Sequence, residues 1–185
     1  RLSVDNISHE HLAYYSLASL KPLLERHGLE INDVQLRDIN GGCFRTLVSR
    51  AGTRPVEPSV AAQEAVERRA GLGLAATYRT FAEQARAQLD QLRKVVIDAH
   101  AAGDLVSVYG ASTRGAVLWQ AAGLDVGQLP KVVDRNPAKV GRYMSAIGAP
   151  IISEAQARVE HPDLLLVGPW WLREDFIERE RDYLA

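Results

Sequence analysis

The stretch Leu105-Val-Ser-Val-Tyr-Gly-Ala-Ser-Thr-Arg-Gly-Ala-Val-Leu-Trp119 decides the fold of this chain. A short valine-containing run stops at Gly110, crosses a small polar turn and resumes as an apolar helix after Gly115. In this layout the backbone N–H groups of the turn and of the helix N-terminus can face a phosphate. The stretch therefore predicts a ligand-binding turn in an α/β domain.

The residues of the turn suit a diphosphate. Gly110 and Gly115 permit a tight turn and the close approach of a ligand. Ser112 or Thr113 can cap the helix, and Arg114 can pair with a phosphate. The spacing fits neither the dinucleotide-binding pattern nor the P-loop, which needs a lysine directly after its last glycine. A plain strand-to-helix turn without a ligand remains the alternative.

Strands and helices alternate from residue 104 to the end of the chain. The strands are expected at 105–109, 131–134, around Ile151 and at 163–167, and the helices at 113–122, 153–159 and 171–182. Short apolar runs separated by helices are typical of parallel sheets with crossover connections. We expect an α/β fold with a small Rossmann-like parallel sheet and flanking helices over 104–185.

The first half of the chain predicts a β-hairpin followed by a long helical segment. A helix closed by Gly28 precedes two alternating runs, 29–39 and 43–50, which Asn40-Gly-Gly joins as a hairpin turn. Residues 51–58 form a linker, and Ser59 is expected to cap the helical segment 59–102, which two glycines near residue 72 interrupt. One apolar face of that segment is expected to be core or interface.

Composition limits the possible functions. The chain has 185 residues, a formal net charge of -1 and a single cysteine. This near-neutral charge predicts no nucleic-acid partner. No apolar stretch approaches the roughly 18 residues of a membrane span, so we expect no membrane partner. We expect a cytoplasmic location. Because Cys43 is the single cysteine, an internal disulfide is excluded. We expect Cys43 to be a small packing residue. Because the sequence begins at Arg1, we expect it to be part of a longer protein.

Two further positions follow predicted strands. Asp134 ends the strand after the turn, about 20 residues past the glycines, where a dinucleotide-binding fold places an acid against a ribose hydroxyl. Asp134-Arg-Asn-Pro137 is equally typical of a capped turn, and both roles can coexist. Trp170 follows the last strand at the same sheet edge and is a candidate for the wall of a pocket.

The lead-in Ser8-His-Glu-His-Leu12 combines two imidazoles with a carboxylate. Such a group can supply a general base with an orienting acid. A solvated histidine pair is the alternative, and no metal site is expected, because no third ligand follows at a zinc-binding spacing.

Several motifs together resemble the C-terminal portion of the SAM-dependent sugar C-methyltransferases. They are Asn6-Ile-Ser-His-Glu-His-Leu12, Asn40-Gly-Gly-Cys-Phe-Arg45, Tyr109-Gly-Ala-Ser-Thr-Arg-Gly115, Val133-Asp-Arg-Asn-Pro-Ala-Lys-Val-Gly141 and Pro169-Trp-Trp-Leu-Arg173. The resemblance implies that 1–58 closes a methyltransferase domain, that 59–103 is a connector and that 104–185 is a Rossmann-like C-terminal domain. It also implies that SAM is bound by a domain outside this chain, and that zinc belongs only to an N-terminal domain outside it.

The resemblance further implies methylation of a carbon in a nucleotide-linked keto-deoxysugar, such as a dTDP-linked one. The family motif is Tyr-His-Glu-His, and its second histidine is the proposed base that removes the proton next to the sugar ketone. His11 takes that role here and Glu10 supports it. The sequence departs from the family at Ser8, where the family has Tyr, and at Trp171, where the family tends to have Asn.

Two alternatives from other classes stay open. The turn also suits an NAD- or CoA-binding module, and the segment 59–102 suits a noncatalytic interaction domain that forms a homodimer. If the methyltransferase assignment holds, this chain alone is expected to bind a nucleotide sugar weakly and to transfer no methyl group.

Overall fold

The computed structural model describes residues 3–8, 10–39 and 41–184. They form two compact units: the α/β unit, Arg1–Glu10 with Gln84–Ala185, and the hairpin unit, His11–Glu83. The boundary falls within the long helix α3 (Ala75–Ala102). The division into 1–58, 59–103 and 104–185 that the resemblance implied remains a prediction. No helix in the described part of the chain combines the length and the apolar character that crossing a bilayer requires.

The hairpin unit contains the predicted hairpin. Its elements are α1 (Leu17–Glu25), β1 (Leu29–Arg37), β2 (Cys43–Arg50) and α2 (Pro58–Arg69). The two strands pair antiparallel. A small core of side chains from both helices and β1 covers one face, and its buried members are Leu17, Ile31, Val34 and Val60.

Two expectations in this unit were wrong. Ser59 is not the helix cap, because α2 already begins at Pro58, whose fixed φ suits a first helical position. The Ser59 hydroxyl instead donates to Asp33 and accepts from the Val34 N–H, so it ties α2 to β1. Cys43 is exposed at the start of β2 rather than packed, because it lies next to the hairpin turn.

A buried carboxylate joins the two helices of the hairpin unit. Glu67 of α2 is 4% exposed and accepts hydrogen bonds from the N–H groups of Leu17 (2.7 Å) and Ala18 (2.8 Å). These are the first N–H groups of α1, which have no partner within the helix. The negative charge also complements the helix dipole, so Glu67 caps α1 from a distance of 50 residues along the chain.

The α/β unit has the predicted parallel sheet. Its elements are η1 (Val4–Asn6), β3 (Val106–Tyr109), α4 (Thr113–Ala121), β4 (Lys131–Val133), β5 (Tyr143–Met144), β6 (Ala149–Ile152), α5 (Glu154–Glu160), β7 (Leu164–Val167), η2 (Trp170–Leu172), α6 (Arg173–Arg179) and α7 (Arg181–Leu184). The strand order is β5-β6-β4-β3-β7, and only β5 is antiparallel to its neighbour. The sequence did not predict β5, and the expected helix at 171–182 is divided into η2, α6 and α7.

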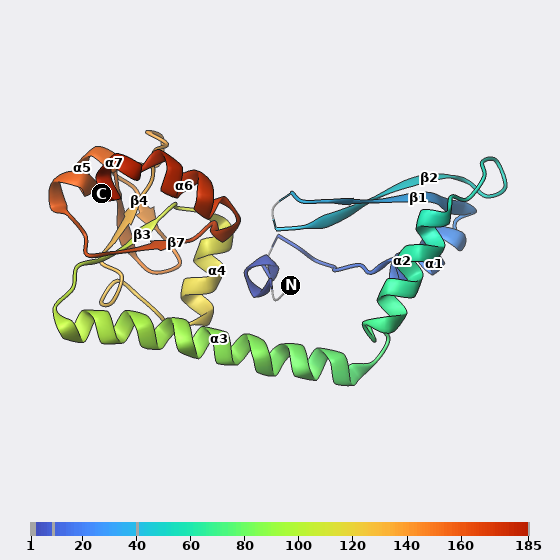
Figure 1. The fold of residues 1–185 in the computed structure, drawn as a ribbon, viewed down its shortest axis with the longest axis horizontal. Coiled ribbons are helices and arrows are strands. Elements are labelled where there is room, and N and C mark those ends of the chain that lie inside the picture. The colour runs from blue at the N-terminus through green and yellow to red at the C-terminus, as the bar shows by residue number, and fades with distance from the viewer. Residues whose placement is uncertain (1–2, 9, 40, 185) are drawn as a thin grey trace. The chain divides into compact units, whose positions relative to one another are not determined.

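Helices cover both faces of this sheet, as Figure 1 shows for α3 and α4 on one side and α5 and α6 on the other. Successive strand residues point to opposite faces. Val108 and Val132 therefore pack toward Trp119 of α4, whereas Val133 packs in a second cluster with Phe176 of α6. The near-continuous burial of β3 reflects this two-sided packing.

Three glycines meet where β3 and β7 end. Gly110 has φ +97, and a Cβ there would lie 2.9 Å from Cδ of Pro169. A Cβ on Gly168 would lie 3.2 Å from the Gly110 oxygen and 3.3 Å from Cα of Gly115. The first turn of α4 thus packs directly against the backbone that follows β7, and a side chain at any of the three positions would separate them.

Replacing Gly110 by Ala tests this contact. We expect a loss of about 1–2 kcal/mol from the left-handed backbone and of about 1–3 kcal/mol more from the collision with Pro169. Gly103→Ala is the matched control, because Gly103 has φ +90 and open space around its missing Cβ. Denaturant unfolding followed by tryptophan fluorescence measures both variants, since all three tryptophans lie in the α/β unit. Equal losses would contradict the close packing.

Candidate functional site

The glycine turn lies at the point where the strand order reverses. β4 and β7 pair with β3 on its two sides, and the turn follows β3 directly. In open parallel sheets, ligands bind outside the carboxyl ends of the strands at this point. Ser112 caps α4, because its Oγ accepts the N–H of Gly115 at 3.0 Å. Thr113 is the first residue of α4 and is exposed.

A cavity of about 540 Å³ opens beside the turn. This volume lies within the range of small-molecule sites. Its walls come from the turn, from the loop after β4, from the start of α5 and from the segment after β7, and they include Gly110, Ser112, Asp134, Arg135, Lys139, Glu154, Trp171, Phe176 and Arg179. The cavity thus gathers the aromatic rings of Tyr109, Trp171 and Phe176 and several charged groups at the sheet edge that the sequence predicted. It is named the nucleotide cavity for the ligand that is proposed for it below.

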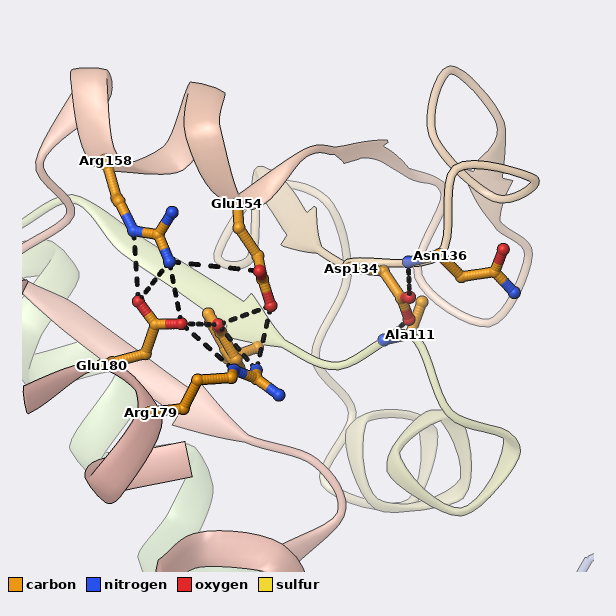
Figure 2. Close-up of polar contacts among 8 residues, drawn as sticks. Ala111, Asp134, Asn136, Glu154, Arg158, Arg179 and Glu180 are labelled. Carbon is orange, nitrogen blue, oxygen red and sulfur yellow. Dashed lines mark hydrogen bonds and ion pairs between the residues drawn. The ribbon is translucent and has the colours of Figure 1, made fainter. Parts of the chain in front are cut away.

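Asp134 links the two loops on either side of the nucleotide cavity (Figure 2). Its carboxylate accepts from the Ala111 N–H at 2.9 Å and from the Asn136 N–H at 2.8 Å. Lys139 pairs with it at 3.0 Å and also donates to the Ala111 carbonyl at 2.7 Å. The bond to Asn136 confirms the capped turn that the sequence predicted, and the ribose contact remains a prediction.

The ionised form of Asp134 is favoured. Burial opposes ionisation, but hydrogen bonds from the Asn136 N–H, from Lys139 and from the Ala111 N–H outweigh it and hold the pKa of Asp134 below its usual 3.8. A carboxylate whose pKa is lowered by folding stabilises the folded state at neutral pH. That stabilisation is lost as the pH falls through the folded-state pKa.

Asp134→Asn should therefore destabilise the chain in a pH-dependent way. At neutral pH we expect a loss of about 1–3 kcal/mol, because the backbone donors and Lys139 lose a charged acceptor. The difference between the parent chain and the variant should shrink as the pH drops below 3.8, where the carboxylate becomes protonated. Urea unfolding over a pH series measures this. A difference that stays constant down to the lowest pH would contradict the lowered pKa.

A buried polar network closes the nucleotide cavity on the side of α5 and α6 (Figure 2). The Tyr109 hydroxyl lies 2.8 Å from Glu154 and 2.7 Å from Glu180, and it accepts a hydrogen bond from Arg179 at 2.9 Å. Arg158 pairs with Glu180 at 2.7 Å. Burial raises the pKa of Tyr109, and its bond to Glu180 adds to this effect, so the phenol keeps its proton. The network fixes Arg179 at the cavity wall.

A second cavity, of about 580 Å³, lies on the other side of the turn. It shares Ala111, Ser112 and Lys139 with the nucleotide cavity. Glu10 of the lead-in also lines it. The structure therefore brings one predicted catalytic residue beside the predicted binding turn. This space is called the Glu10 cavity below.

Arg114 points away from the turn toward a buried carboxylate. Its Nη2 lies 2.6 Å from Oδ2 of Asp5, and its guanidinium lies 4.1 Å from the centre of the Trp171 ring. The indole N–H of Trp170 donates to the same Asp5 oxygen at 3.1 Å. Trp170 lines a third, largely apolar cavity beside Leu89, whereas its neighbour Trp171 lines the nucleotide cavity.

The other predicted catalytic residue belongs to the hairpin unit. His11 is exposed, and its ring makes an edge contact with Tyr14 at a centroid distance of 5.9 Å. His9 lies outside the described residues. Within residues 3–8, 10–39 and 41–184, no three His, Cys, Asp or Glu side chains are grouped to hold a metal ion.

Comparison with known proteins assigns the family. The family described as C-methyltransferase C-terminal domain matches residues 38–185. This chain belongs to that family. C-methyltransferase NovU of Streptomyces niveus is 37% identical over 185 residues, which cover 97% of this chain and 43% of that protein. The chain thus spans less than half the length of this curated relative.

Sequence reasoning missed several residues of the site. Lys139 and Trp171 lie inside motifs that were recognised, but their contacts depend on how two loops approach each other. Arg179 and Asp5 carried no local signal, because each meets its partners only after distant segments pack together. The position of Asp5, four residues before the histidine pair, was visible in the sequence. Its burial could not be predicted from the sequence.

Proposed function

We propose that this chain is the nucleotide-sugar-binding C-terminal part of a SAM-dependent sugar C-methyltransferase. The observation that supports this most is the position of the glycine turn between two cavities that share Ala111, Ser112 and Lys139. A nucleotide sugar is a long ligand with a diphosphate in its middle. With the diphosphate at the turn, the nucleoside would lie in the nucleotide cavity and the sugar in the Glu10 cavity.

The groups at the turn suit each part of this ligand. The diphosphate would lie over Gly110 and against the first turn of α4, where Ser112 and Thr113 offer hydroxyl groups. Arg135 is exposed at the cavity wall and makes no ion pair with another described residue, so its charge is available to an anion. Trp171 offers an aromatic face to a base, and Asp134 lies where a ribose hydroxyl would be expected.

SAM is proposed to be bound by a part of the protein outside this chain. It would supply the electrophilic methyl group when bound. The positive end of α4 and the exposed Arg135 favour an anion at the nucleotide cavity, which supports a diphosphate at the turn.

The proposed chemistry begins with proton removal by His11. The imidazole takes the proton next to the sugar ketone, and the electron pair of the broken C–H bond forms an enolate whose negative charge lies on oxygen. The nucleophilic carbon of this enolate would then bond to the methyl group of the donor as the methyl–sulfur bond breaks, and the electron pair of that bond would stay on sulfur. Glu10 would orient or stabilise the imidazolium. Because Ser8 replaces the family Tyr, no phenol at this position stabilises the enolate oxygen.

Binding of dTDP to the full-length protein tests the proposed ligand. We expect Arg135→Ala to weaken dTDP binding about tenfold in isothermal calorimetry, because a charge-assisted bond to phosphate is lost. Arg142→Ala is the matched control, since Arg142 is also exposed but lines neither cavity at the turn, and it should leave the affinity unchanged. NADH and CoA serve as competing probes. Tighter binding of either one would overturn the proposal, and a dimer that binds none of the three would favour the interaction domain.

His11→Ala tests the proposed base. In the full-length protein we expect the exchange of the substrate α-proton with deuterated water, and methyl transfer with it, to fall by roughly 100- to 10,000-fold. The affinity for dTDP should persist, because His11 lies outside the turn. His27→Ala, which changes another exposed histidine of the hairpin unit, should leave the exchange rate unchanged. Exchange that survives in His11→Ala would show that another group is the base.

A further inference from the structure

Asp5 is the most unusual charged residue of the α/β unit. It lies in the three-residue turn of 3-10 helix η1, yet only 1% of it is exposed. A buried carboxylate is costly unless charged or hydrogen-bonding partners compensate its lost hydration. Among the described residues, Asp5 has two such partners: Arg114 at 2.6 Å and the indole N–H of Trp170 at 3.1 Å.

These partners come from distant parts of the fold. Arg114 lies in the first turn of α4, directly after the glycine turn, and Trp170 begins η2 after β7. Both elements flank the point where β3 and β7 diverge. Asp5 therefore joins the lead-in to the two segments that build the turn. The Arg114 guanidinium is further held by the Trp171 ring at 4.1 Å.

Only a short piece of chain separates Asp5 from the proposed catalytic pair. Glu10 follows after five residues, which span at most roughly 17 Å when fully extended. The backbone between them is partly folded, since the Ile7 N–H bonds to the Val4 carbonyl and the Ser8 N–H to the Asn6 carbonyl, both at 3.0 Å. Fixing Asp5 thus limits where Glu10, the last residue of the lead-in within the α/β unit, can lie.

We infer that Asp5 is the positioning residue for Glu10, and that Arg114 serves this carboxylate rather than the substrate diphosphate. The inference rests on the proposed function, because that function gives Glu10 its catalytic role. The contacts of Asp5 with Arg114 and Trp170 do not depend on it. The inference replaces the direct phosphate role that the sequence suggested for Arg114. The two roles have different consequences: a phosphate ligand sets the affinity for dTDP, whereas a positioning link sets the rate of proton removal.

Asp5→Asn and Trp170→Phe in the full-length protein separate these roles. Asp5→Asn keeps the shape of the side chain but removes its charge. Trp170→Phe removes the indole donor and the five-membered part of the ring but leaves the Asp5 charge in place, so the second variant remains informative where the first fails to fold. With a dTDP-linked keto-deoxysugar in deuterated water, we expect α-proton exchange to slow by up to about 100-fold in Asp5→Asn, because misplacement of a catalytic group has effects of this size. The slowing should be smaller in Trp170→Phe.

Calorimetry with dTDP should give an unchanged affinity for both variants and for Arg114→Gln. Asp5→Asn combined with Arg114→Gln should exchange no more slowly than the slower single variant, because both changes break one link. Glu160→Gln is the matched control. It breaks another partly buried ion pair of the same unit, with Lys131 at 2.5 Å, and should leave exchange unchanged.

A readout without substrate completes the test. Amide hydrogen exchange over residues 6–10 should accelerate in Asp5→Asn and in Trp170→Phe but not in Glu160→Gln. Weaker dTDP binding in Arg114→Gln with full exchange activity in Asp5→Asn would overturn the inference, as would unchanged amide protection in both lead-in variants. A parent protein that exchanges no substrate proton would instead overturn the proposed function, while the amide measurement would still decide the role of Asp5.

Discussion

The site depends on one steric constraint, the contact of three glycines at the divergence of β3 and β7. Backbone atoms of Gly110, Gly115 and Gly168 approach so closely that no Cβ fits between them without movement. This contact sets the direction in which the chain leaves β3 and the position at which α4 begins. It also brings the segment after β7 against the turn, and with it both Trp170 and Trp171. The cavities, the cap at Ser112 and the pairing of Arg114 all follow from this arrangement.

Carboxylates of the protein itself form ion pairs with positively charged side chains around the turn. Asp134 binds Lys139 and the Ala111 N–H, and Asp5 binds Arg114. Such pairing compensates part of the hydration that charged groups lose on burial, and it holds the loops in one geometry before a ligand arrives. A diphosphate at this turn would then be recognised mainly by helix N–H groups, hydroxyls and Arg135, rather than by a cluster of free cations. Recognition of this kind favours a fixed orientation of the ligand over tight binding of any anion.

The sequence predicted features that depend on local or periodic signals. Neighbouring residues or short apolar runs predicted the β1–β2 hairpin, the break before α3, the parallel strands and the cap at Ser112. Asn40, the first residue of the predicted hairpin turn, lies outside the described residues. The two-residue strand β5 has too few residues to show a period, and the end of the last helix is broken where Glu180 turns inward to meet Tyr109 and Arg158. The partners of Asp5 and of Arg179 lie far away in the chain, so no local pattern could reveal them. The same limit applies to the two tryptophans, because their sequence order does not tell which ring faces the nucleotide cavity.

The resemblance noted from the sequence implies two departures from the family, at Ser8 and at Trp171, and the structure shows the surroundings of the second. The Trp171 ring lies against the Arg114 guanidinium. Arg114 in turn binds Asp5, which lies three residues before Ser8, the position of the family Tyr. This series of contacts ends at Asp5, and Ser8 is joined to it only along the chain, where the Ser8 N–H bonds to the Asn6 carbonyl at 3.0 Å. A change at Trp171 would therefore act first on the packing of the Arg114 guanidinium and, through it, on Asp5.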